Sequence, residues 1–165
     1  MANSLQRTDK EIAELYQRHV KTVYRVCFAY MKNAADADDL MQETFVKLMR
    51  QEPRFESAAH EKAWLIRTAT NLCKDGLKHW WHKREKLEDF EHLQSGQPPE
   101  TDTTFDVITG LPDKYKTVIY MYYYEGYSTL EIARALSKPQ NTVLSHLREA
   151  RIILKNKLEG DANHG

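Results

Sequence analysis

The 165-residue chain has little that would cross-link a secreted protein or anchor one in a membrane. Its two cysteines, Cys27 and Cys73, lie far apart in helical patterns and predict a reducing compartment rather than a disulfide framework. No apolar run approaches the roughly 20 residues that a membrane-spanning helix needs. The N-terminal segment MANSLQRTDKEIAEL lacks the apolar core of a signal peptide. These absences predict a cytoplasmic protein without membrane insertion.

The chain also lacks an excess of charge and any familiar catalytic motif. Its 24 Lys and Arg balance 24 Asp and Glu, so an affinity for nucleic acid must come from local clusters. There is no G-x-S-x-G, no H-E-x-x-H and no phosphate loop. Cys73, His79 and His82 match no common zinc spacing and lack a fourth ligand. We therefore expect no catalytic residue, no metal and no cofactor.

Alternating strand patterns are missing, and every periodic segment has a helical period. The run from Val118 to Tyr124, VIYMYYY, has strand propensity. However, it follows Leu111-Pro112-Asp113-Lys114, a good helix start, and it ends at Gly126, which suits a helix C-terminus. We interpret it as a helix and predict an all-α fold.

A helix-turn-helix is predicted from Ser128 to Leu147, STLEIARALSKPQNTVLSHL. Ser128 and Glu131 have the spacing of a capping box, which favours a helix start. Pro139 cannot lie inside a helix, so a second helix is expected from about Asn141. Such a unit presents its second helix to the DNA major groove. An ordinary helical hairpin would give the same pattern.

The second helix of this unit has two distinct sides. Apolar residues recur on the inward side, at Val143, Leu147, Ala150 and Leu154. The outward side carries Asn141, Ser145, Arg148 and Ile152, with a basic edge of Arg148, Arg151 and Lys155. Its first turns could read base edges and the remainder could hold phosphates.

The segment between Leu87 and Asp106 has six acidic residues and no Lys or Arg. It contains Gly96 and the pair Pro98-Pro99, and residues 91–104 carry no helical pattern. This composition is typical of a flexible acidic linker. It predicts two small helical domains, residues 1–86 and 101–160, joined by a linker over 87–100.

Residues Asp39 to Phe45, DLMQETF, are predicted to open an amphipathic helix that ends near Arg50. The expected buried side consists of Leu40, Met41, Phe45, Leu48 and Met49. The expected polar side consists of Asp39, Gln42, Glu43 and Lys47. A solvated and well-capped helix face would show the same pattern.

A further helix is predicted around Trp64 to His82, with Trp64 in the core. Its apolar side carries Leu65, Ala69, Leu72 and Trp80. A second side carries Arg67, Asn71, Lys74 and Lys78 at helical spacing, and we call these four residues the basic stripe. Cations interleaved with aromatic rings suit single-stranded nucleic acid, because cations follow phosphates and rings stack on bases. A solvated surface is the alternative interpretation.

Four motifs occur in one order: DLMQETF, WLIRTATN, then LPDKYK and TVLSHLREAR beyond the acidic linker. This arrangement resembles the extracytoplasmic-function (ECF) sigma factors of bacterial RNA polymerase, in the sigma-70 family, from about Leu15 to Leu158. The resemblance implies that the two domains are sigma regions 2 and 4. It also implies binding to core RNA polymerase, recognition of the minus-35 and minus-10 promoter elements, and DNA melting. An anti-sigma factor is a further implied partner.

The resemblance also assigns residues. Binding to core polymerase falls to Asp39, Leu40, Gln42, Glu43 and Phe45. Contact with the melted minus-10 element falls to Arg67, Asn71, Lys74 and Lys78, and to the loop from Arg54 to Lys62, which with this helix would hold a flipped base. Recognition of the minus-35 element falls to Asn141, Thr142, Leu144, Ser145, Arg148 and Glu149.

The chain departs from the family pattern at several positions. Ser137 stands where the turn usually has Gly, and Leu144, His146 and Glu149 stand where basic residues are common. Two other classes of protein stay open. A stand-alone helix-turn-helix regulator would bind duplex DNA without polymerase, and a helical adaptor would have basic faces that are only solvated.

Overall fold

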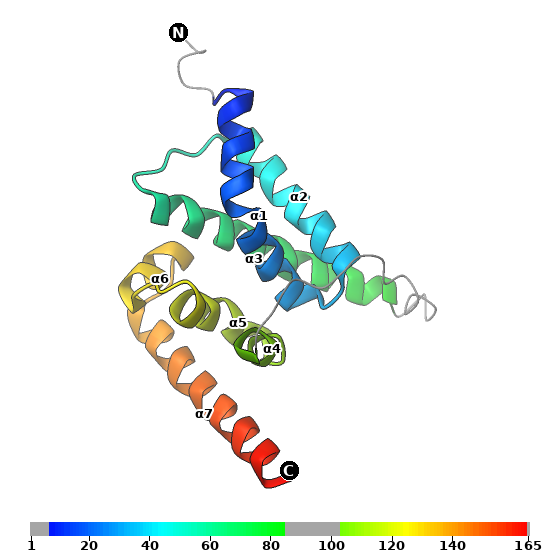
Figure 1. Cartoon of the computed structure of the whole chain (residues 1–165), viewed down its shortest axis with the longest axis vertical. Helices are drawn as coiled ribbons and strands as arrows, with labels where there is room; N and C mark the ends of the chain where they lie inside the picture. Colours follow the sequence, from blue (N-terminus) through cyan, green and yellow to red (C-terminus); the bar gives the residue numbers. More distant parts are fainter. Residues whose placement is uncertain (1–6, 85–102, 165) are drawn as a thin grey trace. The chain divides into compact units, whose positions relative to one another are not determined.

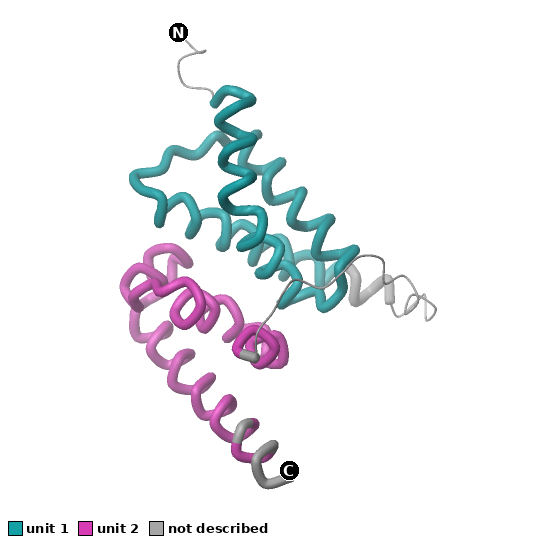
Figure 2. The backbone as a smooth tube through the Cα atoms, viewed as in Figure 1, with its two compact units in different colours: residues 1–99 teal, residues 100–165 magenta. Residues whose placement is uncertain are grey.

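The protein, described by a computed structural model, has a defined backbone over residues 7–84 and 103–164 (Figure 1). Within these residues all regular elements are helical, which confirms the predicted all-α class. The helices form two compact units, residues 1–99 and 100–165 (Figure 2). The predicted linker over 87–100 lies outside the described residues. Among the helices that are described, none combines the length and the apolar character needed to cross a membrane.

Unit 1 consists of three helices that all pack on one another: α1 (Asp9–Met31), α2 (Ala34–Gln51) and α3 (Ala58–Arg84). Each of the first two begins at a side-chain cap. Thr8 accepts a hydrogen bond from the Glu11 amide, and Asn33 accepts one from the Asp36 amide. The core between the helices is apolar and includes Val23, Cys27, Leu48, Leu65, Ile66 and Ala69.

Helix α2 starts earlier than predicted. The Asn33 cap places its first residue at Ala34, so DLMQETF begins in the second turn rather than opening the helix. The expected burial of Leu40, Met41, Phe45 and Leu48 is confirmed, but Met49 is 44% exposed. A helix turns by about 100° per residue, which carries Met49 past the edge of the buried stripe.

The two cysteines are free thiols, both fully buried in unit 1. Although they are far apart in sequence, the packing of α1 on α3 brings them together. A hydrogen bond with Cys73 and burial raise the pKa of Cys27 well above its ordinary value of 9.0. Both thiols therefore behave as small core residues. Their separation in the sequence gave no sign of this contact.

Unit 2 opens with helix α4 (Thr103–Thr109). This helix includes Thr103 and Thr104, for which no helical pattern was visible. Phe105 and Ile108, both buried, explain the difference because one face of this short helix is anchored in the unit's core. Helix α5 (Asp113–Ile119) follows Pro112, as the helix-start signal predicted.

The VIYMYYY segment is helical, which confirms its interpretation, but it is not a uniform α-helix. From Tyr120 it widens into the π-helical turn η3 (Tyr120–Tyr124), where the amide of Glu125 bonds to the carbonyl of Tyr120. Gly126, at φ 79°, then reverses the chain in a conformation that favours glycine.

The helix-turn-helix consists of α6 (Thr129–Leu136) and α7 (Gln140–His164). The capping box is formed: Ser128 accepts from the Glu131 amide, and Glu131 accepts from the Ser128 amide. Ser137 adopts a left-handed φ of 52° and ends α6, and the Lys138 amide bonds to the carbonyl five residues earlier. A non-glycine residue in this conformation costs about 1 kcal/mol.

Candidate nucleic-acid interface

The basic stripe lies on the solvent side of α3. Arg67, Asn71 and Lys78 are exposed, and Lys74 is half-buried. Leu65 and Ala69, on the other side of the same helix, are fully buried against α1 and α2. The 3.6-residue period therefore separates a core face from a face with three cations and one amide. Cations of this kind bind phosphates, and an amide can pair with a base edge.

The loop between α2 and α3 leads into the stripe. It starts at Glu52, which has a left-handed φ of 47°. The ring of Phe55 lies edge-on to Trp64, with centroids 6.0 Å apart, and to His60, with centroids 5.5 Å apart. Trp64 is half-buried rather than enclosed in the core, because it shares this boundary with the loop. The basic stripe thus lies on α3, and the loop that contains Phe55 directly precedes this helix.

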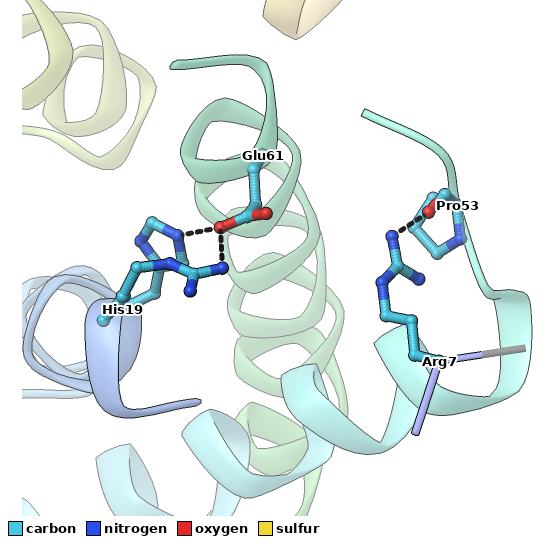
Figure 3. Close-up of polar contacts among 5 residues, drawn as sticks. Arg7, His19, Pro53 and Glu61 are labelled. Carbon is cyan, nitrogen blue, oxygen red and sulfur yellow. Dashed lines mark hydrogen bonds and ion pairs between the residues drawn. The ribbon is translucent and has the colours of Figure 1, made fainter. Parts of the chain in front are cut away.

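A partly buried polar cluster joins the start of α3 to α1 (Figure 3). The Nε2–H of His19 donates to Oε1 of Glu61 at 2.5 Å, and Arg18 donates to the same oxygen at 3.0 Å. Burial alone would raise the pKa of Glu61, but the hydrogen bonds from His19 and Arg18 outweigh it and hold this pKa below 4.5. The residue types alone did not single out these three side chains. Only their contacts in the folded structure reveal the cluster.

The Nδ1 atom of His19 is buried and has no hydrogen-bond partner among the described residues. With a proton on Nε2, the imidazole ring donates to Glu61, and this contact joins α1 to α3.

The polar face of α2 is available for contact. Asp39, Gln42 and Glu43 are exposed, and Gln42 donates to the carboxylate of Asp38 at 2.8 Å. Leu40 and Phe45, which the family resemblance placed in the same interface, point into the core of unit 1. Within unit 1, these two residues hold the helix in place, while the three polar side chains form its outer surface.

The proposed recognition helix, α7, has the two sides that the sequence predicted. Val143, Leu147 and Ala150 are buried, and Leu154 is half-buried. The outward residues Asn141, Leu144, Ser145, Arg148 and Ile152 are exposed, and Thr142 is half-buried. The pattern that defined an inner and an outer side is thereby confirmed.

Two charged residues of α7 are engaged within unit 2. Glu149 accepts a hydrogen bond from the Tyr115 hydroxyl at 2.6 Å. Arg151, expected on a basic edge, donates to the Tyr123 hydroxyl and lies over the Tyr122 and Tyr123 rings. These contacts attach α7 to α5 and to η3. The sequence gave no sign of them, because the partners lie 28 or more positions away.

Among the residues that the structure describes, no three His, Cys, Asp or Glu side chains are grouped as metal ligands. The candidate binding features are instead exposed surfaces. They are the polar face of α2, the basic stripe of α3 and the outward face of α7. Surfaces of this kind bind macromolecules.

Comparisons with known proteins agree with both units. The family model of Sigma-70 region 2 matches residues 15–83, and that of Sigma-70, region 4 matches residues 106–154. The ECF RNA polymerase sigma factor SigW of Bacillus subtilis is 27% identical, over 90% of this chain and 87% of its own length. The ECF RNA polymerase sigma-E factor of Haemophilus influenzae is also 27% identical, over 93% and 97% respectively.

Solved structures share the fold. The sigma factor RpoE of Bartonella quintana, in complex with the anti-sigma factor NepR, has a TM-score of 0.71 at 17% identity, covering 91% of this chain and 98% of that one. CnrH, in complex with the cytosolic domain of CnrY, has a TM-score of 0.69 at 21% identity, covering 97% and 95%. With both sigma-70 regions matched in order, this chain belongs to the ECF sigma factors of the sigma-70 family.

Proposed function

We propose that this protein binds core RNA polymerase through the polar face of α2 and brings the polymerase to promoters. In this proposal α7 reads the minus-35 element, and α3 with its preceding loop opens the minus-10 element. The observation that carries the proposal is the exposed basic stripe of α3 in a chain that also contains a helix-turn-helix. The first suits a melted strand and the second suits duplex DNA.

Each surface has a distinct role in this mechanism. Asp39, Gln42 and Glu43 supply acceptors and an amide for polymerase. In the basic stripe, Arg67, Lys74 and Lys78 follow the phosphates of the separated strand, and Asn71 pairs with an unstacked base. On α7, the exposed residues Asn141, Ser145 and Arg148 meet base edges. The protein binds and positions nucleic acid, and it performs no bond chemistry of its own.

An inhibitory anti-sigma factor is part of the proposal. Both solved relatives described above are complexes: RpoE with an anti-sigma factor, and CnrH with the cytosolic domain of CnrY. We infer a partner of the first kind for this chain, competing with core polymerase. Such a sigma factor would act where the polymerase is, in the cytoplasm.

Transcription by purified core polymerase on a library of randomised promoters tests the proposal. The full chain should yield promoter-dependent transcripts that core polymerase alone does not make. Sequence-specific binding to duplex DNA without polymerase would instead indicate a stand-alone regulator. Neither transcripts nor DNA binding would indicate a helical adaptor.

A further inference from the structure

Arg7, just before α1, contacts the loop that leads into the basic stripe. Its guanidinium donates a hydrogen bond to the carbonyl oxygen of Pro53 (Figure 3). The same guanidinium lies over the ring of Phe55, with its central carbon 5.1 Å from the ring centroid. One half-buried side chain thus holds both the backbone and a side chain of a loop 46 or more residues away. Lysine could not combine these contacts equally well, because it lacks the planar, stacking fork of arginine.

Helix α3 also contacts this loop. The rings of His60 and Trp64 make edge contacts with the ring of Phe55, which therefore contacts both Arg7 and the first turns of α3. The amide of Glu56 donates to Nδ1 of His60 at 3.1 Å. The amide of His60 in turn donates to Oγ of Ser57 at 3.1 Å. Together these contacts join residues 53–57 to Arg7 and to the first turns of α3.

We propose that Arg7 is a positioning residue, which holds the 53–57 loop in the conformation that receives an unpaired base of the melted strand. This inference rests on the proposed function. It gives Arg7, which lies outside both DNA-binding motifs, a role in binding the melted strand. A loop that is ordered before it binds does not pay its ordering entropy during binding. If the receptive conformation is only partly populated, apparent affinity falls by the same fraction.

Four variants of the full chain separate positioning from direct contact. Arg7→Ala removes both contacts, and Arg7→Lys keeps the charge but loses the fork. Phe55→Leu removes the ring while keeping apolar volume. Lys10→Ala is the matched control, because Lys10 is an exposed cation in the first turn of α1. Each is assembled with core polymerase and tested on a randomised promoter library. Each free chain is also titrated with a single-stranded oligonucleotide that carries the selected minus-10 sequence.

If Arg7 positions the loop, Arg7→Ala should reduce discrimination between base sequences. It should leave the electrostatic attraction to phosphates unchanged. Arg7→Ala should bind the selected oligonucleotide about tenfold more weakly, equivalent to about 1.4 kcal/mol. It should bind a scrambled oligonucleotide as the wild type does and should relax base preference at one minus-10 position. Arg7→Lys should recover part of the loss, and Lys10→Ala should match the wild type. Adding Phe55→Leu to Arg7→Ala should cost less than the two single effects combined.

The dependence of affinity on salt distinguishes the alternative. A direct phosphate contact would make Arg7→Ala weaker on every sequence and would flatten the salt slope by about 0.7. That result, or unchanged base preference in Arg7→Ala, would overturn the positioning role. Absence of promoter-dependent transcripts from the wild type would instead overturn the proposed function. The two failures therefore have different signatures.

Discussion

The hydroxyl of Tyr115 on α5 donates a 2.6 Å hydrogen bond to the carboxylate of Glu149 on α7. The edge of His146 also meets the Tyr115 ring, with centroids 5.5 Å apart. Lys114 lies over the same ring, and the pKa of this lysine is raised above 10.5 chiefly by its contact with Tyr115. Glu149, which the family resemblance placed at the DNA surface, thus also joins two helices of unit 2.

We expect the Tyr115–Glu149 bond to stabilise the C-terminal unit. Tyr115→Phe and Glu149→Gln should each lower the free energy of unfolding by about 1 to 2 kcal/mol, because the acceptor is charged. The double variant should lose less than the sum, which urea denaturation of the three variants can measure. Glu159→Ala is the control, since its 4.0 Å pair with Lys155 is exposed and should contribute little. Full additivity would contradict the bond.

Core polymerase should dissociate more readily from a variant that lacks the acidic face of α2. Asp39→Ala combined with Glu43→Ala removes two exposed carboxylates and leaves the buried Leu40 and Phe45 in place. We expect weaker co-purification with core polymerase and an unchanged helical circular dichroism spectrum. Glu14→Ala, an exposed acid on α1, should bind as the wild type does. Equal recovery of the double variant would remove α2 from the interface.

The basic stripe should contribute in two separable ways. Lys78→Ala should weaken binding to all single strands and reduce the salt slope by about 0.7. Asn71→Ala should leave the slope unchanged and impair promoter opening, because an amide recognises a base rather than a charge. Permanganate footprinting of the promoter measures the opening. Normal footprints with Asn71→Ala would contradict the base-binding role.

Local sequence patterns predicted the helices well. They did not predict the features that depend on contacts between residues far apart in the chain. The capping box joins Ser128 and Glu131, which are only three positions apart, so the sequence alone predicted the start of α6. The π-helical turn at Tyr120 depends on how neighbouring helices pack, which no local pattern records. The same reason explains why the stripe was found while the Arg7 and Glu149 contacts were not.

Acid should weaken unit 1 through Glu61. Its pKa in the folded state lies below the ordinary value of 4.5. Its contribution to stability is therefore present above about pH 4.5 and is lost as pH falls through the folded-state pKa. Urea denaturation at pH 7 and at about pH 3 should show this loss, and Glu61→Gln should reduce it. An equally steep loss in Glu61→Gln would assign the acid sensitivity to other carboxylates.

The last prediction concerns how strongly unit 2 binds DNA by itself. Its outward face on α7 offers Asn141, Ser145 and Arg148 to bases, but few cations to phosphates. Arg151 is shared with Tyr123, and Lys155 lies 4.0 Å from Glu159. Affinity for duplex DNA comes largely from neutralised phosphates, so the isolated unit should bind at the non-specific level of roughly 10⁻⁴ to 10⁻⁶ M. In the holoenzyme the rest of the chain is already bound, which holds unit 2 near its DNA site. The effective concentration of unit 2 at that site can then reach about millimolar.

Fluorescence anisotropy of residues 101–160 on promoter duplex, beside the full holoenzyme, measures this difference. In the holoenzyme, Arg148→Ala should cost about 1 to 3 kcal/mol and relax preference at one minus-35 position, because a bidentate base contact is lost. Lys155→Ala should instead weaken binding equally on all sequences, as loss of a phosphate contact does. Nanomolar and sequence-specific binding by the isolated unit would contradict the prediction. In that case recognition would need no polymerase, and the chain could act as a stand-alone regulator.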